Sequence, residues 1–168
     1  MKILSKENAR ELLDGKPPDA FIAQLSSQLQ LVEGAYSAPA NSGVQIALSK
    51  LFAYRLFRSA PVCLYVTDWG IATEHPDLFD GYRRSLGERR PLIEAPFHVF
   101  EKTDEDAFIS LLCVVLFFRW DASVFDIAGR SLLQTSHDGW LEVRASEEAF
   151  RKELAVELEH HGVRLLAP

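Results

Sequence analysis

The sequence has few cysteines, and none in a spacing that binds metal or builds a disulfide framework. Its two cysteines, Cys63 and Cys113, each lie within an apolar run. Two cysteines without CxxC spacing predict neither a zinc site nor a disulfide scaffold. We expect both to be buried, unbridged thiols that react slowly, because apolar surroundings disfavour the reactive thiolate.

The sequence also lacks a hydrophobic run long enough to cross a membrane. Its longest apolar stretch, residues 107–118, is about twelve residues long and is interrupted by Ser110, whereas a spanning helix needs about twenty residues. The amino-terminal segment reaches the acidic Glu7 before any apolar region, which is not typical of a signal peptide. We therefore expect no membrane partner and a cytoplasmic location.

Positive charge is in the minority. The chain has 18 Lys and Arg residues against 24 Asp and Glu residues, which gives a net charge of −6. A protein held to nucleic acid by phosphate contacts needs a positive surface, so we do not expect a nucleic-acid partner. The negative charge is compatible with a basic protein partner.

Known catalytic and cofactor motifs are absent as well. The sequence contains no GxGxxG, GxxxxGK[ST], HExxH or GxSxG pattern and no EF-hand loop. These absences disfavour the common nucleotide-binding, zinc-protease and α/β-hydrolase classes. We expect no catalytic residues, no cofactor and no metal site.

The patterns that are present predict helices and strands in alternation. The segment 62–67 is apolar or β-branched at every position, which is typical of a central strand covered on both faces. The segment 103–119 is apolar almost all round, so we expect a helix buried on every side. Helices are predicted at about residues 5–15, 19–32, 42–58, 75–87, 103–119 and 146–162. Strands are predicted at 62–67, 97–100, 121–127, 131–135 and 140–143.

This order predicts an α+β fold, a single-domain layer sandwich over residues 1–168. Residues 1–60 form a mainly helical amino-terminal part, and residues 61–168 follow the order β-α-β-α-β-β-α. The sheet is expected to be mixed or antiparallel, with about four to five strands and helices packed on it.

A candidate binding surface begins where the strand 62–67 ends. A loop exposes Asp68 there while the strand holds it in place, and the next residue, Trp69, is of a type common at binding hot spots. The alternative is that Asp68 makes a turn and Trp69 packs over the sheet edge. The predicted turn before the strand 140–143, and that strand itself, add two more carboxylates and a second tryptophan. The predicted binding residues are Asp68, Trp69, Asp138, Trp140 and Glu142.

Four arginines within eight positions form a second candidate site. Guanidinium groups bind two oxygens of a carboxylate or phosphate at once, so such a cluster suits an anionic ligand. The alternative is a solvated helix end, in which Asp80 pairs with Arg84 and Glu88 lies among the rest. The predicted anion-binding residues are Arg83, Arg84, Arg89 and Arg90.

The histidines suggest acid–base or metal-binding roles, with less support than the two candidate sites above. His98 and Asp68 could form an acid–base pair if their strands are adjacent. His137 and Asp138 could contribute to a metal site, but two ligands do not specify one. His160 and His161 lie where a helix is expected to end, a position that favours cations.

Two functions follow as hypotheses. The first is a non-catalytic protein-binding module, either an adaptor, regulator or immunity-type inhibitor of a basic partner, or a self-associating protein. The second is a small enzyme or anion-binding domain that uses Asp68, Glu94, His98 and the arginine cluster. A deep pocket in which these side chains converge would favour the second hypothesis, and a flat surface bearing Trp and carboxylates the first.

Overall fold

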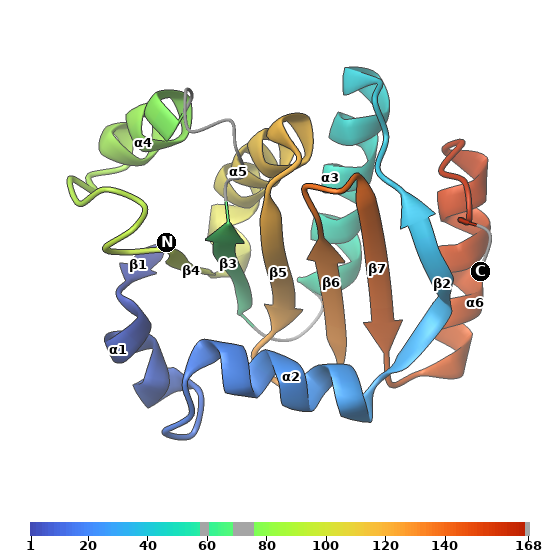
Figure 1. Ribbon diagram of the computed structural model, residues 1–168, viewed down its shortest axis with the longest axis horizontal. Coiled ribbons are helices and arrows are strands. Elements are labelled where there is room, and N and C mark those ends of the chain that lie inside the picture. Colours follow the sequence, from blue (N-terminus) through green and yellow to red (C-terminus); the bar gives the residue numbers. More distant parts are fainter. Residues whose placement is uncertain (58–60, 69–75, 167–168) are drawn as a thin grey trace.

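A computed structural model describes residues 1–57, 61–68 and 76–166 of the chain, and their strands form a single antiparallel sheet (Figure 1). The strand order is β1-β4-β3-β5-β6-β7-β2. The strands are β1 (Lys2–Leu4), β2 (Gln30–Ser37), β3 (Val62–Asp68), β4 (Phe97–Phe100), β5 (Asp121–Asp126), β6 (Ser131–Thr135) and β7 (Trp140–Ala145). The α-helices are α1 (Lys6–Ala9), α2 (Pro18–Gln28), α3 (Ser42–Leu56), α4 (Pro76–Ser85), α5 (Glu105–Phe118) and α6 (Glu148–His160).

Helices cover both faces of the sheet, so the fold has three layers. Side chains of α3, α5 and α6 pack on one face, and side chains of α1 and α2 pack on the other. In β3, Leu64 and Val66 point into the first core, whereas Cys63 and Tyr65 point into the second. Successive side chains of a strand point to opposite faces, so a strand covered on both sides must be apolar throughout. The prediction that 62–67 is a central strand is confirmed.

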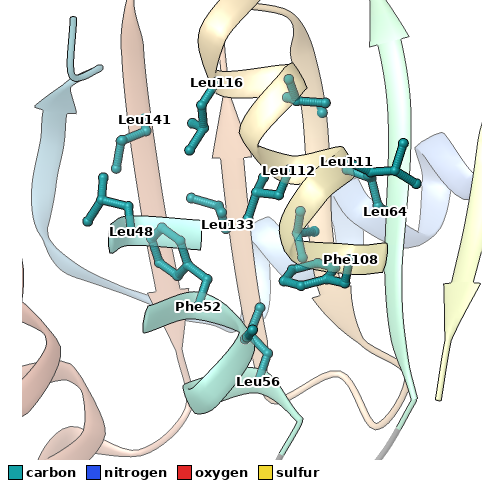
Figure 2. Packing of buried hydrophobic residues seen from close by; sticks show 14 of the residues in the cluster. Leu48, Phe52, Leu56, Leu64, Phe108, Leu111, Leu112, Leu116, Leu133 and Leu141 are labelled. Atoms are coloured by element: carbon teal, nitrogen blue, oxygen red, sulfur yellow. The ribbon is translucent and has the colours of Figure 1, made fainter. Parts of the chain in front are cut away.

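The larger core lies between the helices α3 and α5 and the sheet (Figure 2). Figure 2 shows leucine and phenylalanine side chains of both helices directed at leucines of β3, β6 and β7. The prediction that the helix at 103–119 is buried holds for its inner face, which contains Leu111, Leu112, Val115 and Leu116. It is wrong for the opposite face, because Phe117 is 61% exposed and Val114 only half-buried. The helix α5 therefore buries one face and leaves the other open.

The sheet is wider than predicted, because two edge strands come from the part expected to be mainly helical. β1 has only three residues, too few for a strand pattern. β2 begins within the helix predicted at 19–32 and continues into residues for which the sequence predicts no strand. The backbone of Leu29 is extended and ends α2, and the pairing of β2 with β7 shifts register between Leu31 and Ala35, which disturbs regular alternation. The three consecutive strands predicted at 121–127, 131–135 and 140–143 are confirmed as β5, β6 and β7, one strand more than the order β-α-β-α-β-β-α contains.

Two glycines set the turns of this meander. Gly129 follows β5 with φ of +70°, and Gly139 precedes β7 with φ of +82°. A residue with a Cβ is strained at such angles, so glycine allows the tight reversal. The turn at Gly139 carries His137 and Asp138 to one end of the sheet. None of the described helices combines the length and apolar character needed to cross a membrane.

Candidate functional site

Acidic side chains from three separate segments meet at one end of the sheet, at the top of Figure 1. β3 ends at Asp68 and β5 begins at Asp121, and the antiparallel register places these two residues opposite each other. The β6–β7 turn lies at the same end, because Ala122 at the start of β5 pairs with Thr135 at the end of β6. We call Asp68, Asp121, His137 and Asp138 the acidic rim.

Hydrogen bonds to Asp121 hold the acidic rim together. Its Oδ1 lies 2.6 Å from the backbone nitrogen of His137, which donates to it, and 2.9 Å from Nδ1 of the same residue. The imidazole Nε2 lies 3.6 Å from Oδ1 of Asp138. The hydrogen bond and charge of Asp121 raise the pKa of His137, with smaller contributions from Asp138 and Asp68. Three carboxylates thus surround one imidazole, so the rim stays negative even when the ring is protonated.

None of the described helices crosses the part of the sheet face that lies beside the acidic rim. In Figure 1, α2 crosses the sheet near the opposite end and leaves the strands near the rim bare on that side. Trp140 and Glu142 of β7 point to this face, because Leu141 and Val143 between them point into the α3–α5 core. A shallow pocket of about 150 Å³ opens here, and its wall includes Thr67, Asp121, Ser123, Gln134 and Trp140.

The structure brings four of the five predicted binding residues to this end of the sheet. Asp68 and Asp138 belong to the acidic rim, Trp140 lines the pocket that also contains Asp121, and Glu142 lies opposite Gln134 of the pocket wall. Glu142 is also paired with Arg144 at 3.1 Å. Trp69 lies outside the described residues.

The four arginines of the anion-binding hypothesis have different environments. Arg83 is completely buried and donates to Asp80 at 2.8 Å and to the carbonyl of Ala95 at 2.7 Å, and burial lowers its pKa. Asp80 therefore pairs with Arg83, whereas the sequence analysis expected it to pair with Arg84.

Arg90 is likewise engaged within the fold. It donates to Glu88 through Nε at 2.9 Å and to the carbonyl of Ile3 at 2.8 Å. Arg84 and Arg89 are exposed. Two of the four guanidinium groups thus hold the fold together, and the four do not form one exposed cluster.

The residues of the enzyme hypothesis do not converge either. β4 is adjacent to β3 as that hypothesis required, but His98 lies opposite Leu64 and is fully buried, far along the strand from Asp68. Burial lowers the pKa of His98 to about 3. Glu94 is exposed in the connection before β4. None of the five principal pockets on the described surface is lined by any of these three residues.

A second concave surface is the groove between α3, α4 and α5. It has a volume of about 290 Å³ and an almost wholly apolar wall, in which Ile46, Leu78 and Phe117 are exposed. Cys113 lines the groove and is half-buried, whereas Cys63 is fully buried in the sheet. The prediction of buried, unbridged thiols is confirmed for Cys63, while Cys113 is unbridged but partly open.

This difference predicts unequal reactivity of the two thiols. Burial raises the pKa of Cys63, and the charge of Asp126 raises it further, so its thiolate is strongly suppressed. In the native protein, a thiol reagent should modify Cys113 at least about tenfold faster than Cys63. Mass spectrometry of peptides after timed labelling measures both rates, and labelling in denaturant shows both thiols to be available. Equal native rates would contradict the packing described for β3.

Sequence reasoning missed Asp121 and saw in His137 only an incomplete ligand set. The positions of Asp121 and His137 in the site depend on the strand order, because Asp121 meets Asp68 only if β5 pairs with β3. A comparison of the chain with protein-family models, with curated proteins and with solved structures finds no match, so no function is carried over from a relative.

Proposed function

We propose that this protein is a non-catalytic protein-binding module, acting as an adaptor, regulator or inhibitor of a basic partner. The observation that supports the proposal is the acidic rim with Trp140 beside it, next to the part of the sheet face that α2 leaves bare among the described helices. We propose that the partner places Lys or Arg side chains at the rim and an apolar group on Trp140.

Charge and residue type favour this assignment. The whole chain carries a net charge of −6, and a negative surface steers a positive partner into contact and disfavours acidic ones. Trp140 is half-buried, so it offers a large, pre-positioned contact area, and tryptophan is enriched among residues that dominate binding energy. The side chain of Asp138 is 72% exposed and accessible to a partner.

The alternative, an enzyme or anion-binding domain, has less support from the geometry. Its proposed base, His98, is sealed in the core, and two of its arginines are engaged within the fold. A substrate would have to reach groups that do not share a pocket. Four of the five residues of the binding hypothesis, in contrast, lie at one end of the sheet, where Asp138 is exposed and Trp140 lines the pocket.

The test is capture of a partner from a native lysate of the source cells, with a metal chelator present, followed by quantitative mass spectrometry. The wild type should retain at least one protein with a basic surface. Asp68→Asn/Asp138→Asn should reduce its retention at least about tenfold, and Trp140→Ala should do the same.

A matched control separates local charge from total charge. Glu11→Gln/Glu159→Gln removes the same two negative charges from exposed positions on the 3-10 turn after α1 and on α6. This variant should retain the partner as the wild type does. If no retained protein is selectively lost from the rim variants, or if the control loses it equally, the proposal is wrong. Melting temperatures of all variants ensure that folded proteins are compared.

A further inference from the structure

We infer that Asp68, Asp121 and His137 form a binding site for a divalent transition-metal cation such as Zn²⁺. One potential ligand atom of each residue lies within 4.8 Å of the others, although the residues come from the end of β3, the start of β5 and the β6–β7 turn. The inference stands independently of the proposed protein partner.

The potential ligand atoms are close enough together to bind one metal ion after small side-chain movements. Zinc lies about 2.0–2.2 Å from carboxylate oxygen and imidazole nitrogen, so atoms bound to one ion are about 3–4 Å apart. Nδ1 of His137 and Oδ1 of Asp121 are 2.9 Å apart, and the Nδ1–H proton forms a hydrogen bond to the carboxylate. A cation would replace that proton and bridge the two atoms, and the carboxylate of Asp68 would complete three protein ligands.

The surroundings hold the ligands in the way that metal sites require. The backbone nitrogen of His137 donates to Asp121, which fixes the carboxylate, and Gly139 fixes the turn that carries the ring. Asp138 lies 3.6 Å from Nε2, the ring nitrogen that would not touch the metal. A carboxylate beside that nitrogen is the usual partner of a metal-bound histidine, because it orients the ring and strengthens its basicity.

The neighbouring pocket supplies room for the remaining coordination positions. Three protein ligands leave at least one position for water or a small ligand. Asp121 is shared by the metal site and the pocket, whose volume is about 150 Å³. Ser123 also lines this pocket, at 5% exposure. A pocket of this volume has room for a metal-bound water molecule beside Asp121.

The donor set determines the class of ion. Imidazole favours zinc and its transition-metal neighbours, whereas Mg²⁺ and Ca²⁺ prefer all-oxygen sites. The two carboxylates Asp68 and Asp121 balance the double positive charge. The sequence alone gave no reason to expect this site, because His137 and Asp138 by themselves do not specify one.

The test is calorimetric titration of the purified, chelator-treated protein with ZnCl₂ at pH 7.5, with native mass spectrometry for stoichiometry. We expect one Zn²⁺ per chain. We expect His137→Gln to weaken binding at least tenfold, and Asp68→Asn to do so as a second variant if His137→Gln folds poorly. A hundredfold excess of MgCl₂ should not displace the zinc.

His160 and His161 provide the matched control, because this adjacent pair at the end of α6, with His160 exposed and His161 half-buried, could bind zinc adventitiously. His160→Gln/His161→Gln should leave the affinity unchanged. Zinc binding that disappears in this control, that persists unchanged in His137→Gln, or that is absent from the wild type would overturn the inference. None of these outcomes depends on a protein partner, so this test and the capture test fail separately.

Discussion

Replacing Leu112 by Ala should lower the free energy of unfolding by about 2–5 kcal/mol. Leu112 is completely buried on the inner face of α5, where Figure 2 shows it directed toward Leu133 of β6. Truncation removes apolar contacts and leaves a cavity, because α3 and the sheet hold the surrounding side chains in place. Urea denaturation followed by circular dichroism measures the loss.

Phe117, five positions farther along the same helix, provides the control. Its side chain is 61% exposed and lines the apolar groove. Phe117→Ala should change stability by less than about 1 kcal/mol, although it removes a larger side chain. If the two variants lost similar amounts of stability, the assignment of the inner and outer faces of α5 would be incorrect.

The sequence predicted the interior of this fold better than its edges. The strand at 62–67 can be identified from the sequence because both of its faces pack in the interior, so an apolar or β-branched residue stands at every position. β2 could not be identified in this way, because it pairs only with β7, carries a register irregularity and mixes polar with apolar residues. Edge strands are specified by the partner they join, and a local pattern does not contain that partner.

The same limit applies to the candidate site. Asp68 could be singled out because it follows a buried strand, and Trp140 because it begins a strand after a turn. The meeting of Asp68 with Asp121 depends on the β3–β5 pairing, across a gap of more than fifty residues in the chain. The burial of Arg83 could not be predicted either. A charged residue near a helix end is expected at the surface, but Arg83 is buried and donates to Asp80 and to the carbonyl of Ala95.

We also expect acid to destabilise the protein through the buried side chain of His98. The imidazole is fully buried, with the rings of Phe79 and Phe100 at centroid distances of 5.6 and 6.3 Å. Nδ1 lies 3.3 Å from the carbonyl of Leu64, and Nε2 has no hydrogen-bond partner among the described residues. Burial first, and then the charge of Arg83, lower the pKa of His98 to about 3 from the ordinary value of 6.5. The native ring is therefore predominantly neutral at pH values well above 3.

The sign of the pH effect follows from proton counting. Between pH 6.5 and about 3 the unfolded chain binds a proton at His98 that the folded chain does not, so acid favours unfolding. The contribution is fully present above pH 6.5 and decreases by about 1.4 kcal/mol for each pH unit below it. Urea denaturation at pH 7, 6, 5 and 4 should reveal this slope in the wild type.

His98→Phe should remove the His98 part of that slope. A phenyl ring suits a site between two phenylalanines, and it eliminates the buried, unpartnered Nε2, so the variant should fold at pH 7. Its stability relative to the wild type should then rise by about 3 kcal/mol between pH 7 and pH 4, within about a factor of two. His161→Gln removes a surface histidine and should retain the wild-type slope. Parallel curves for wild type and His98→Phe would mean that the buried ring is not held neutral by the fold.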